Sequence, residues 1–176
     1  NGDGTFASRS TIASTTNTMA TALGDLDGDG DLDFVAGVWG LNRVNLGDGD
    51  GNFGAGSYID TTPSDVTWTI ALGDLDGDGD LDLVTGNQFD KVNRVYLSDG
   101  DGTFAAGTDV DTPALDTSSL TLGDLDADGD LDLVTGNLDV ANQIHLGDGD
   151  GTFAAGVDID TQTNDTRGVS LGDLDG

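Results

Sequence analysis

The chain has 176 residues, with 34 acidic side chains against five basic ones and a formal net charge of −29 at pH 7. This charge argues against nucleic acids and anionic membranes as partners, because both attract basic surfaces. No apolar run reaches the roughly 18 residues that a membrane-spanning helix needs, and the lack of cysteine excludes disulfide bonds and thiolate chemistry.

An acidic segment recurs along the chain with a period of about 50 residues. It reads GDLDGDGDLD from Gly24 and from Gly73, GDLDADGDLD from Gly123, and GDLDG from Gly172 to the last printed residue. We therefore predict a single repeat domain, residues 1–176, that starts and stops within a repeat. Its predicted parts are residues 1–23 (the end of a preceding blade and a first strand), 24–72, 73–122, 123–171 and 172–176 (the start of a truncated fourth repeat).

Each repeat is predicted to contain four short strands. In chain order, the first alternates apolar and polar residues, as around Trp68, Ile70 and Leu72. The second and third follow the acidic segment and are rich in β-branched and apolar residues. The second strands are predicted to start at Leu32, Leu81 and Leu131, and the third strands at Asn42, Asn93 and Asn142. The fourth is predicted after a glycine-rich turn, as at residues 53–60 and 153–160.

No segment shows a sustained apolar period of 3.6 residues, so we expect almost no helix. Four strands in a unit of about 50 residues are typical of one β-propeller blade, whereas the repeats of the competing parallel β-helix are much shorter. The prediction is an all-β chain of β-propeller blades, each of four antiparallel strands. It forms an incomplete propeller, three full blades plus partial blades at both ends, within a longer repeat chain or an assembly that completes the ring.

The acidic segment matches the first nine positions of an EF-hand calcium loop. Counted from Asp25, carboxylates stand at positions 1, 3, 5 and 9, and Gly30 stands at position 6, where such a loop turns sharply. Asp31, at position 7, would contribute its backbone carbonyl while its carboxylate faces water. The bidentate Glu of an EF-hand is missing, and the flanking segments are strand-like. The spacing thus predicts a calcium-binding β-hairpin.

Repulsion between the carboxylates favours a bound cation. Two carboxylates about 4 Å apart repel by ~1 kcal/mol in bulk water and ~4 kcal/mol at an effective dielectric of 20, and a cation turns this repulsion into coordination. The alternative is a set of solvated Asp-Gly turns in an acidic protein. Mg²⁺ is disfavoured because it resists dehydration. Transition metals would need more than His145, which takes the place of Asn45 and Tyr96 and is interpreted as an ordinary strand residue.

The motif DLDGDGDLDLVTG, with NFGAG at 52–56 and TFAAG at 103–107 and 152–156, resembles the FG-GAP repeat, also described as the VCBS type. The Phe-Gly pair matches Phe53 and Gly54, whereas alanine replaces that glycine in the other repeats. The resemblance covers the whole chain. It implies the fold of integrin α-subunit heads and of bacterial surface and fungal lectin relatives, with calcium in the hairpin between the first and second strands of a blade.

Transferred residue by residue, the resemblance implies a Ca²⁺ site in each of the three complete acidic segments. The implied ligands are Asp25, Asp27, Asp29, Asp31, Asp33, Asp74, Asp76, Asp78, Asp80, Asp82, Asp124, Asp126, Asp128, Asp130 and Asp132. Asp173 and Asp175 would begin a fourth site.

Two further features lie outside these segments. The second acidic turn, with Asp48 and Asp50 in the first repeat, is interpreted as a hairpin turn in which Asp-Gly supplies positive φ, with a weaker cation site as the alternative. The loops between second and third strands vary, and on a propeller they share the face opposite the calcium hairpins. Trp39, Phe89 and Lys91 stand there as candidate ligand contacts, with packing between blades as the alternative.

These features predict a calcium-binding, calcium-stabilised β-propeller scaffold, extracellular or on the cell surface, for adhesion or ligand recognition without catalysis. Its expected partners are Ca²⁺ and a protein or glycan ligand on the face opposite the calcium hairpins. The alternative is a carbohydrate-binding, lectin-like module, or an accessory module of a secreted polysaccharide-active enzyme. Catalysis is disfavoured because nearly all carboxylates stand at calcium spacing and no nucleophile–base set can be picked out.

Overall fold

In the computed structural model, the described part of the chain comprises residues 17–60, 66–110, 113–159, 161 and 163–174. It contains twelve strands, and none of these residues forms a helix, so they offer no helical membrane span. The strands form three four-stranded antiparallel sheets, one around each complete acidic segment. This confirms the prediction of an all-β chain built from four-stranded propeller blades.

The strands of each sheet are ordered as in the sequence, so each pairs with the next along the chain. The first sheet comprises β1 (Thr18–Gly24), β2 (Asp33–Val38), β3 (Arg43–Asn45) and β4 (Ser57–Tyr58). The second comprises β5 (Thr67–Gly73), β6 (Asp82–Asn87), β7 (Arg94–Tyr96) and β8 (Thr108–Asp109). The third comprises β9 (Thr117–Gly123), β10 (Asp132–Asn137), β11 (Gln143–His145) and β12 (Val157–Asp158).

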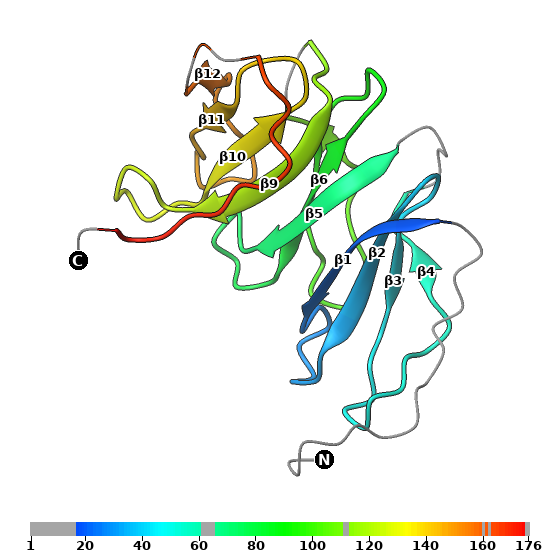
Figure 1. Cartoon of the computed structure of the whole chain (residues 1–176). Helices are drawn as coiled ribbons and strands as arrows, with labels where there is room; N and C mark the ends of the chain where they lie inside the picture. The colour runs from blue at the N-terminus through cyan, green and yellow to red at the C-terminus, as the bar shows by residue number, and fades with distance from the viewer. Residues whose placement is uncertain (1–16, 61–65, 111–112, 160, 162, 175–176) are drawn as a thin grey trace.

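The three sheets stand side by side as successive blades (Figure 1). Their first strands, β1, β5 and β9, are neighbours, and β5 and β9 also contact the second strand of the preceding sheet. The segment 163–174 runs along β9, where Val169 N–H donates to Ser119 Oγ at 3.1 Å. The repeat boundaries and the partial units at both ends stay predictions, and residues 1–16 and Asp175 lie outside the described residues.

The core lies between neighbouring sheets. One cluster fills the first interface: Leu26, Val35, Val44, Leu83 and Tyr96. The other fills the second: Leu75, Val84, Val95, Leu120 and Leu133. Successive residues of β6 thus face opposite interfaces, because side chains alternate along a strand. The second sheet is covered on both faces and needs apolar residues on both, which explains the continuous apolar run of β6. Each fully buried Leu or Val contributes roughly 1.5–3 kcal/mol.

A glycine at the end of each first strand allows the next sheet to approach closely. A Cβ atom on Gly73 would lie 2.7 Å from Leu131 Cδ1 and 3.0 Å from Leu122 Cδ1, so those leucines would have to shift. The same arrangement recurs at Gly24. Because the acidic segment follows directly, this packing fixes the point at which each loop leaves its sheet.

The fourth strands are shorter than predicted. In the first sheet the strand spans only Ser57–Tyr58, against a prediction of residues 53–60. The segment begins with an isolated bridge between Gly47 and Phe53 and joins the ladder only later. Residues 54–56, Gly-Ala-Gly, have little side chain to pack, so the outer edge does not form a continuous strand.

Candidate metal centres and the opposite face

Each acidic segment forms a tight loop between the first and second strands of its sheet. In the first loop, the carboxylate of Asp25 accepts hydrogen bonds from the backbone N–H groups of Gly28 and Gly30, at 2.9 and 3.0 Å. Both glycines have positive φ, 72° and 91°, a conformation that glycine adopts without steric cost. The loop is therefore closed around its first aspartate by local interactions.

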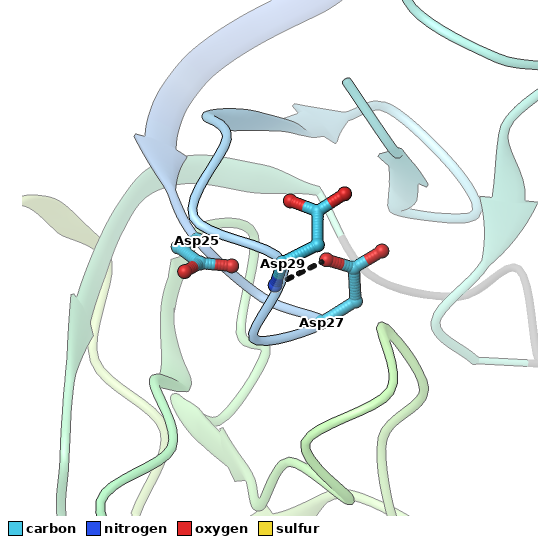
Figure 2. A group of neighbouring side chains, drawn as sticks. All are labelled: Asp25, Asp27 and Asp29. Carbon is cyan, nitrogen blue, oxygen red and sulfur yellow. Dashed lines mark hydrogen bonds between the residues drawn. The ribbon is translucent and has the colours of Figure 1, made fainter. Parts of the chain in front are cut away.

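Successive side-chain turns orient the next two aspartates. Asp27 Oδ1 accepts from the N–H of Asp29 at 3.3 Å, and Asp29 Oδ1 accepts from the N–H of Asp31 at 2.9 Å. Figure 2 shows the side chains of Asp25, Asp27 and Asp29 arising from this one loop, with the first of these hydrogen bonds dashed. One carboxylate oxygen from each of the three lies within 4.8 Å of the others. The loop thus gathers three oxygen donors.

The other loops repeat this arrangement with one difference. In the second loop the gathered residues are Asp74, Asp76 and Asp78. In the third loop they are Asp124, Asp126 and Asp132, so position 9 stands in for position 5. The third loop also has Ala127 in the place of Gly28, with a φ of 65°. Each loop therefore brings three of its five implied ligands together, and we call each set a triad.

The gathered carboxylates disfavour one another's negative charge. Reduced hydration raises the pKa of Asp27, and the charges of the neighbouring aspartates add to the rise. The pKa of Asp126 is raised for the same reasons. Unit charges 4.8 Å apart repel by roughly 1 kcal/mol in water and about 3–4 kcal/mol at an effective dielectric of 20. A divalent cation at the point of convergence would offset this repulsion.

The aspartate at position 9 is buried and bonded to two separate backbone segments. Asp33 Oδ2 accepts from Leu26 N–H at 2.7 Å, and Asp33 Oδ1 accepts from Gly47 N–H at 2.8 Å. Asp82 and Asp132 make the same pair of bonds in their repeats, at 2.7 to 2.9 Å. Burial raises the pKa of Asp82, and the two hydrogen bonds oppose the rise. The ligand role of this position stays a prediction.

The aspartate at position 7 does not face open water, so that expectation is wrong. Asp31 is half-buried, and a Cβ atom on Gly49 would lie 2.5 Å from its Oδ1. Asp80 and Asp130 lie against the corresponding turns of their repeats. The expectation failed because the glycine-rich turn, distant in sequence, folds against the acidic loop.

The second acidic turn is closed by its own hydrogen bonds. Asp48 accepts from Asn52 Nδ2 at 2.9 Å and from Asn52 N–H at 3.0 Å, and these bonds lower the pKa of Asp48. Gly49 and Gly51 have φ of 68° and 85°, as the Asp-Gly interpretation requires. The geometry therefore supports a hairpin turn.

The triads offer a donor set that fits Ca²⁺. Their converging atoms are all carboxylate oxygens, which hard divalent cations prefer. His145, the one histidine of the chain, is buried in β11 and belongs to none of the three gathered sets. The residues of each triad would hold Ca²⁺, and the ion would supply the positive charge that the loop lacks.

Two of the three candidate ligand contacts meet at the opposite end of the sheets. Trp39 follows β2 and Phe89 follows β6, and their ring centroids are 5.8 Å apart at an interplanar angle of 30°. The rings pack against each other across neighbouring sheets, yet Trp39 is 57% exposed and Phe89 55%. Lys91, in the same loop as Phe89, is half-buried. The structure therefore leaves an accessible aromatic pair on this face.

The loop that carries Phe89 has an unusual backbone. Phe89 and Asp90 have φ of 61° and 59°, and the left-handed region costs an L-residue roughly 1–2 kcal/mol. Gly40 stands at the place of Phe89 in the first repeat, with a φ of 130°. Asp90 N–H donates at 3.2 Å to Asp116 Oδ1, just before β9 of the third sheet, which helps to hold the loop. Strain of this kind often marks a functional position.

Sequence reasoning missed a buried polar network beneath these loops. Thr67 Oγ1 accepts from Asn42 Nδ2 of the preceding sheet at 3.0 Å and donates to Asn87 Oδ1 at 2.9 Å. All three residues are buried. The second interface repeats the network, with both distances 2.9 Å, through Asn93, Thr117 and Asn137. The signal in the sequence is the asparagine that opens each third strand and the one that closes LVTGN.

Comparisons with known proteins agree with this architecture. A family model for the FG-GAP-like repeat matches residues 25–85, 80–135 and 124–176. A search of curated proteins found no match. Among solved structures, the chain is similar to an Agrocybe aegerita lectin described as specifically recognising non-reducing terminal N-acetylglucosamine, at 24% identity and a TM-score of 0.59. The similarity covers 81% of this chain and 38% of the lectin chain. Since the matched segments run from residue 25 to residue 176, the chain belongs to the FG-GAP-like repeat family.

Proposed function

We propose that the chain is a calcium-stabilised ligand-recognition module that works in an extracellular setting and is not an enzyme. The observation that carries the proposal is the triad of carboxylates, with oxygens within 4.8 Å of one another, in each of three loops. Generic acidity does not explain why spacing and turn hydrogen bonds recur almost unchanged. The triads are the proposed ligands, and the other aspartates of each loop are further candidates.

Ca²⁺ would act here as a structural ion. By offsetting the repulsion within a triad, it would fix the hairpin between the first and second strands of a blade. Extracellular calcium modules have Kd values of about 0.1–1 mM, which suit the calcium level outside cells. At a Ca²⁺ concentration ten times Kd, binding to the folded state alone stabilises it by about 1.4 kcal/mol per site.

Calorimetric titration and thermal melting test this function. We expect saturable Ca²⁺ binding and a lower Tm after chelation with EDTA. The double variant Asp25→Asn/Asp27→Asn keeps side-chain size, removes two charges from one triad, and should bind less Ca²⁺. Asp48→Asn/Asp50→Asn removes the same charge from the second acidic turn of the first repeat. This variant should bind as much Ca²⁺ as the parent and show the same fall in Tm after chelation. A melting curve unchanged by chelation would contradict the proposal.

Carbohydrate binding is the second candidate, as a lectin-like module or as an accessory module of a secreted polysaccharide-active enzyme. One supporting observation is the fold shared with a lectin described as recognising terminal N-acetylglucosamine. The other is the accessible pair of Trp39 and Phe89, 5.8 Å apart. Aromatic rings can stack on the apolar face of a sugar, and exposed aromatic anchors carry much of the energy at recognition sites.

A glycan array separates this candidate from protein recognition. If the pair binds sugars, Trp39→Ala and Phe89→Ala should each weaken binding by about tenfold or more, a loss of ~1.4 kcal/mol. Tyr58→Ala is the matched control, because Tyr58 is also 57% exposed but lies on the outer strand β4. Sugar binding that survives both substitutions would exclude the pair as the site, and an array without binding would favour a protein ligand.

A further inference from the structure

Backbone hydrogen bonds connect the acidic loops to the repeats that follow them. Gly102 N–H, in the glycine-rich turn of the second repeat, donates to Leu26 O in the first acidic loop at 2.8 Å. Gly151 N–H, in the corresponding turn of the third repeat, donates to Leu75 O in the second loop at 2.9 Å. The first and second loops are thus each bonded to the following repeat, at the same position in each case.

The residues that accept these bonds lie within the acidic loops, so their carbonyl groups move when the loop backbone moves. Leu26 stands between Asp25 and Asp27, two members of the first triad, so its carbonyl moves with the loop backbone. Its side chain is 2% exposed and belongs to the core between the first two sheets. Leu75 has the same place in the second loop and is 5% exposed. A change in loop shape therefore reaches the next sheet through both a buried side chain and a hydrogen bond.

The aspartate at position 9 completes the connection within each repeat. Asp82 Oδ1 accepts from Ser98 N–H, in the turn that contacts the first loop, and Asp82 Oδ2 accepts from Leu75 N–H in the second loop, both at 2.8 Å. Asp82 is fully buried, so water cannot easily replace either bond. Asp132 makes the corresponding bonds in the third repeat, at 2.9 and 2.7 Å. Each of these carboxylates thus connects the glycine-rich turn, which is bonded to the preceding acidic loop, with the acidic loop of its own repeat.

The links form one path in chain order. It runs from the first acidic loop to the glycine-rich turn of the second repeat and through Asp82 to the second acidic loop. It then continues to the glycine-rich turn of the third repeat and through Asp132 to the third acidic loop. Such a path couples sites only if the loops have two states that differ in shape. With the proposed Ca²⁺ binding, the triads would provide these states, because their carboxylates repel one another without a cation and would be drawn together around one. A loop that contracts on binding changes the position of Leu26 O or its equivalent, and thereby of the next turn.

We propose that Ca²⁺ sites in neighbouring repeats are energetically coupled, with Asp82 as the positioning residue that transmits the occupancy of the first loop to the second. Asp132 makes the same link to the third loop and is also a member of its triad. The inference rests on the proposed Ca²⁺ binding and turns three separate sites into one cooperative set. By thermodynamic reciprocity, the second loop raises the affinity of the first by the same factor. The first and third loops are coupled only through the second.

Proteins with two intact loops test the coupling. Pairs of Asp→Asn substitutions silence one loop at a time, at Asp25 and Asp27, at Asp74 and Asp76, or at Asp124 and Asp126. Calorimetric titration with CaCl₂ should give a Hill coefficient above unity when the intact loops are neighbours. When only the first and third loops are intact, they should bind as independent sites. Silencing a neighbour should lower the affinity of a loop by about 5- to 150-fold, the usual range of coupling.

Asp82→Asn and Asp33→Asn form a matched pair of variants. Both replace a fully buried aspartate at position 9 with an amide that has only one acceptor atom. Asp82 lies on the path between the first and second loops, whereas Asp33 ties the first loop to the turn of its own repeat. In the protein with the first and second loops intact, Asp82→Asn should abolish cooperativity and Asp33→Asn should retain it. Stability, which both substitutions lower, is not the readout.

Neighbouring and distant loop pairs that bind Ca²⁺ with the same independent affinities would overturn the coupling and leave the proposed function intact. A parent protein that binds no Ca²⁺ would overturn both. If Asp82→Asn does not fold, the comparison of neighbouring with distant pairs still decides the question, because those proteins keep every aspartate at position 9.

Discussion

Ala127 stands in the left-handed region of the backbone, where the other two acidic loops have Gly28 and Gly77. Its φ is 65°, against 72° and 74° for the glycines. This conformation costs an L-residue roughly 1–2 kcal/mol, because Cβ approaches the carbonyl oxygen. Part of the cost is offset because alanine restricts the unfolded chain more than glycine does. The third loop therefore holds local strain that the first two avoid.

We expect Ala127→Gly to stabilise the protein by about 0.5–1 kcal/mol and to raise Tm by about 1–4 °C. Thermal melting in excess CaCl₂ measures the effect. Ala154→Gly is the control, since Ala154 is outside the left-handed region and glycine there only loosens the unfolded chain. An Ala127→Gly protein that melts lower than the parent would show that contacts of the methyl group outweigh the strain.

His145 is buried at the place that Asn45 and Tyr96 occupy in the other repeats. Within the described structure, neither of its ring nitrogens has a hydrogen-bond partner. Burial lowers the pKa of His145, and the nearby backbone carbonyl of Ala154 opposes this effect. The folded protein therefore keeps a neutral imidazole at a pH where the unfolded chain, with a histidine pKa of about 6.5, already takes up a proton.

Because the folded pKa lies below the unfolded one, we expect His145 to reduce stability as pH falls through about 6.5. The loss reaches up to ~1.4 kcal/mol per pH unit until the folded pKa is reached. His145→Asn introduces the residue of the first repeat, where Asn45 Nδ2 donates to Gly54 O at 2.9 Å. Denaturation of both proteins between about pH 5.5 and 7.5, where ordinary aspartates stay ionised, should show diverging stabilities. Parallel pH curves would exclude titration of His145 as a factor.

That aspartates of each loop gather could be predicted from the sequence, because a short loop converts residue spacing directly into geometry. Which three gather could not, since the third loop uses Asp132 in place of Asp128. The role of Asp33 as a link between two backbone segments could not, because one of its partners, Gly47, belongs to a turn distant in sequence. The contact between Trp39 and Phe89 could not be predicted either, because the two residues belong to neighbouring sheets. The spacing of residues along one strand or loop cannot show what the packing of two sheets brings together.

Thr67, the first residue of β5, joins β6 and the loop before β3 through one hydroxyl group. It satisfies Asn42 Nδ2 from the preceding sheet and Asn87 Oδ1 from its own. Thr67 and Asn87 are fully buried and Asn42 is 1% exposed, so water cannot take the place of the hydroxyl. A buried polar group without a partner costs about 1–3 kcal/mol. The network therefore makes the position of β5 specific as well as stable.

Thr67→Val keeps the shape of the side chain and removes the hydroxyl, which leaves both asparagines short of a partner. We expect a loss of about 2–4 kcal/mol in urea denaturation, without a change in m. Thr69→Val on the same strand is the control and should cost less than about 1 kcal/mol, because valine keeps the Cγ2 methyl group that Thr69 packs against Gly86. Equal losses in the two variants would assign the effect to strand packing instead of the network.

The second strands could be placed almost to the residue from the sequence. Their predicted starts, Leu32 and Leu81, precede the observed starts, Asp33 and Asp82, by one position. The run in β6 reflects burial, because neighbouring sheets cover this strand on both sides and require apolar residues on both faces. β2 shares the same apolar pattern. The fourth strands were not, because β4 is held to β3 by only two residue pairs at the open edge of the sheet. Where pairing rather than burial defines a strand, composition alone does not show its ends.

The charge of the whole molecule is concentrated at one end of the sheets. Of the formal net charge of −29, much lies in the acidic loops and the glycine-rich turns, which pack against each other where Asp31 meets Gly49. Net charge this far from zero destabilises a compact state through self-repulsion. In the proposed function, Ca²⁺ relieves that repulsion where it is strongest.

Salt should therefore stabilise the Ca²⁺-free protein more than the Ca²⁺-loaded protein. The Debye length falls from about 10 Å at 0.1 M salt to about 3 Å at 1 M, which is shorter than the 4.8 Å that bounds the oxygen separations of a triad. Thermal melts in EDTA over this range of KCl should show a larger rise in Tm than the same series in excess CaCl₂. Choline chloride is the control salt, because its bulky cation screens charge without entering the loops. Equal responses with and without Ca²⁺ would mean that repulsion within the triads does not limit the stability of the Ca²⁺-free chain, and that the remaining surface charge does.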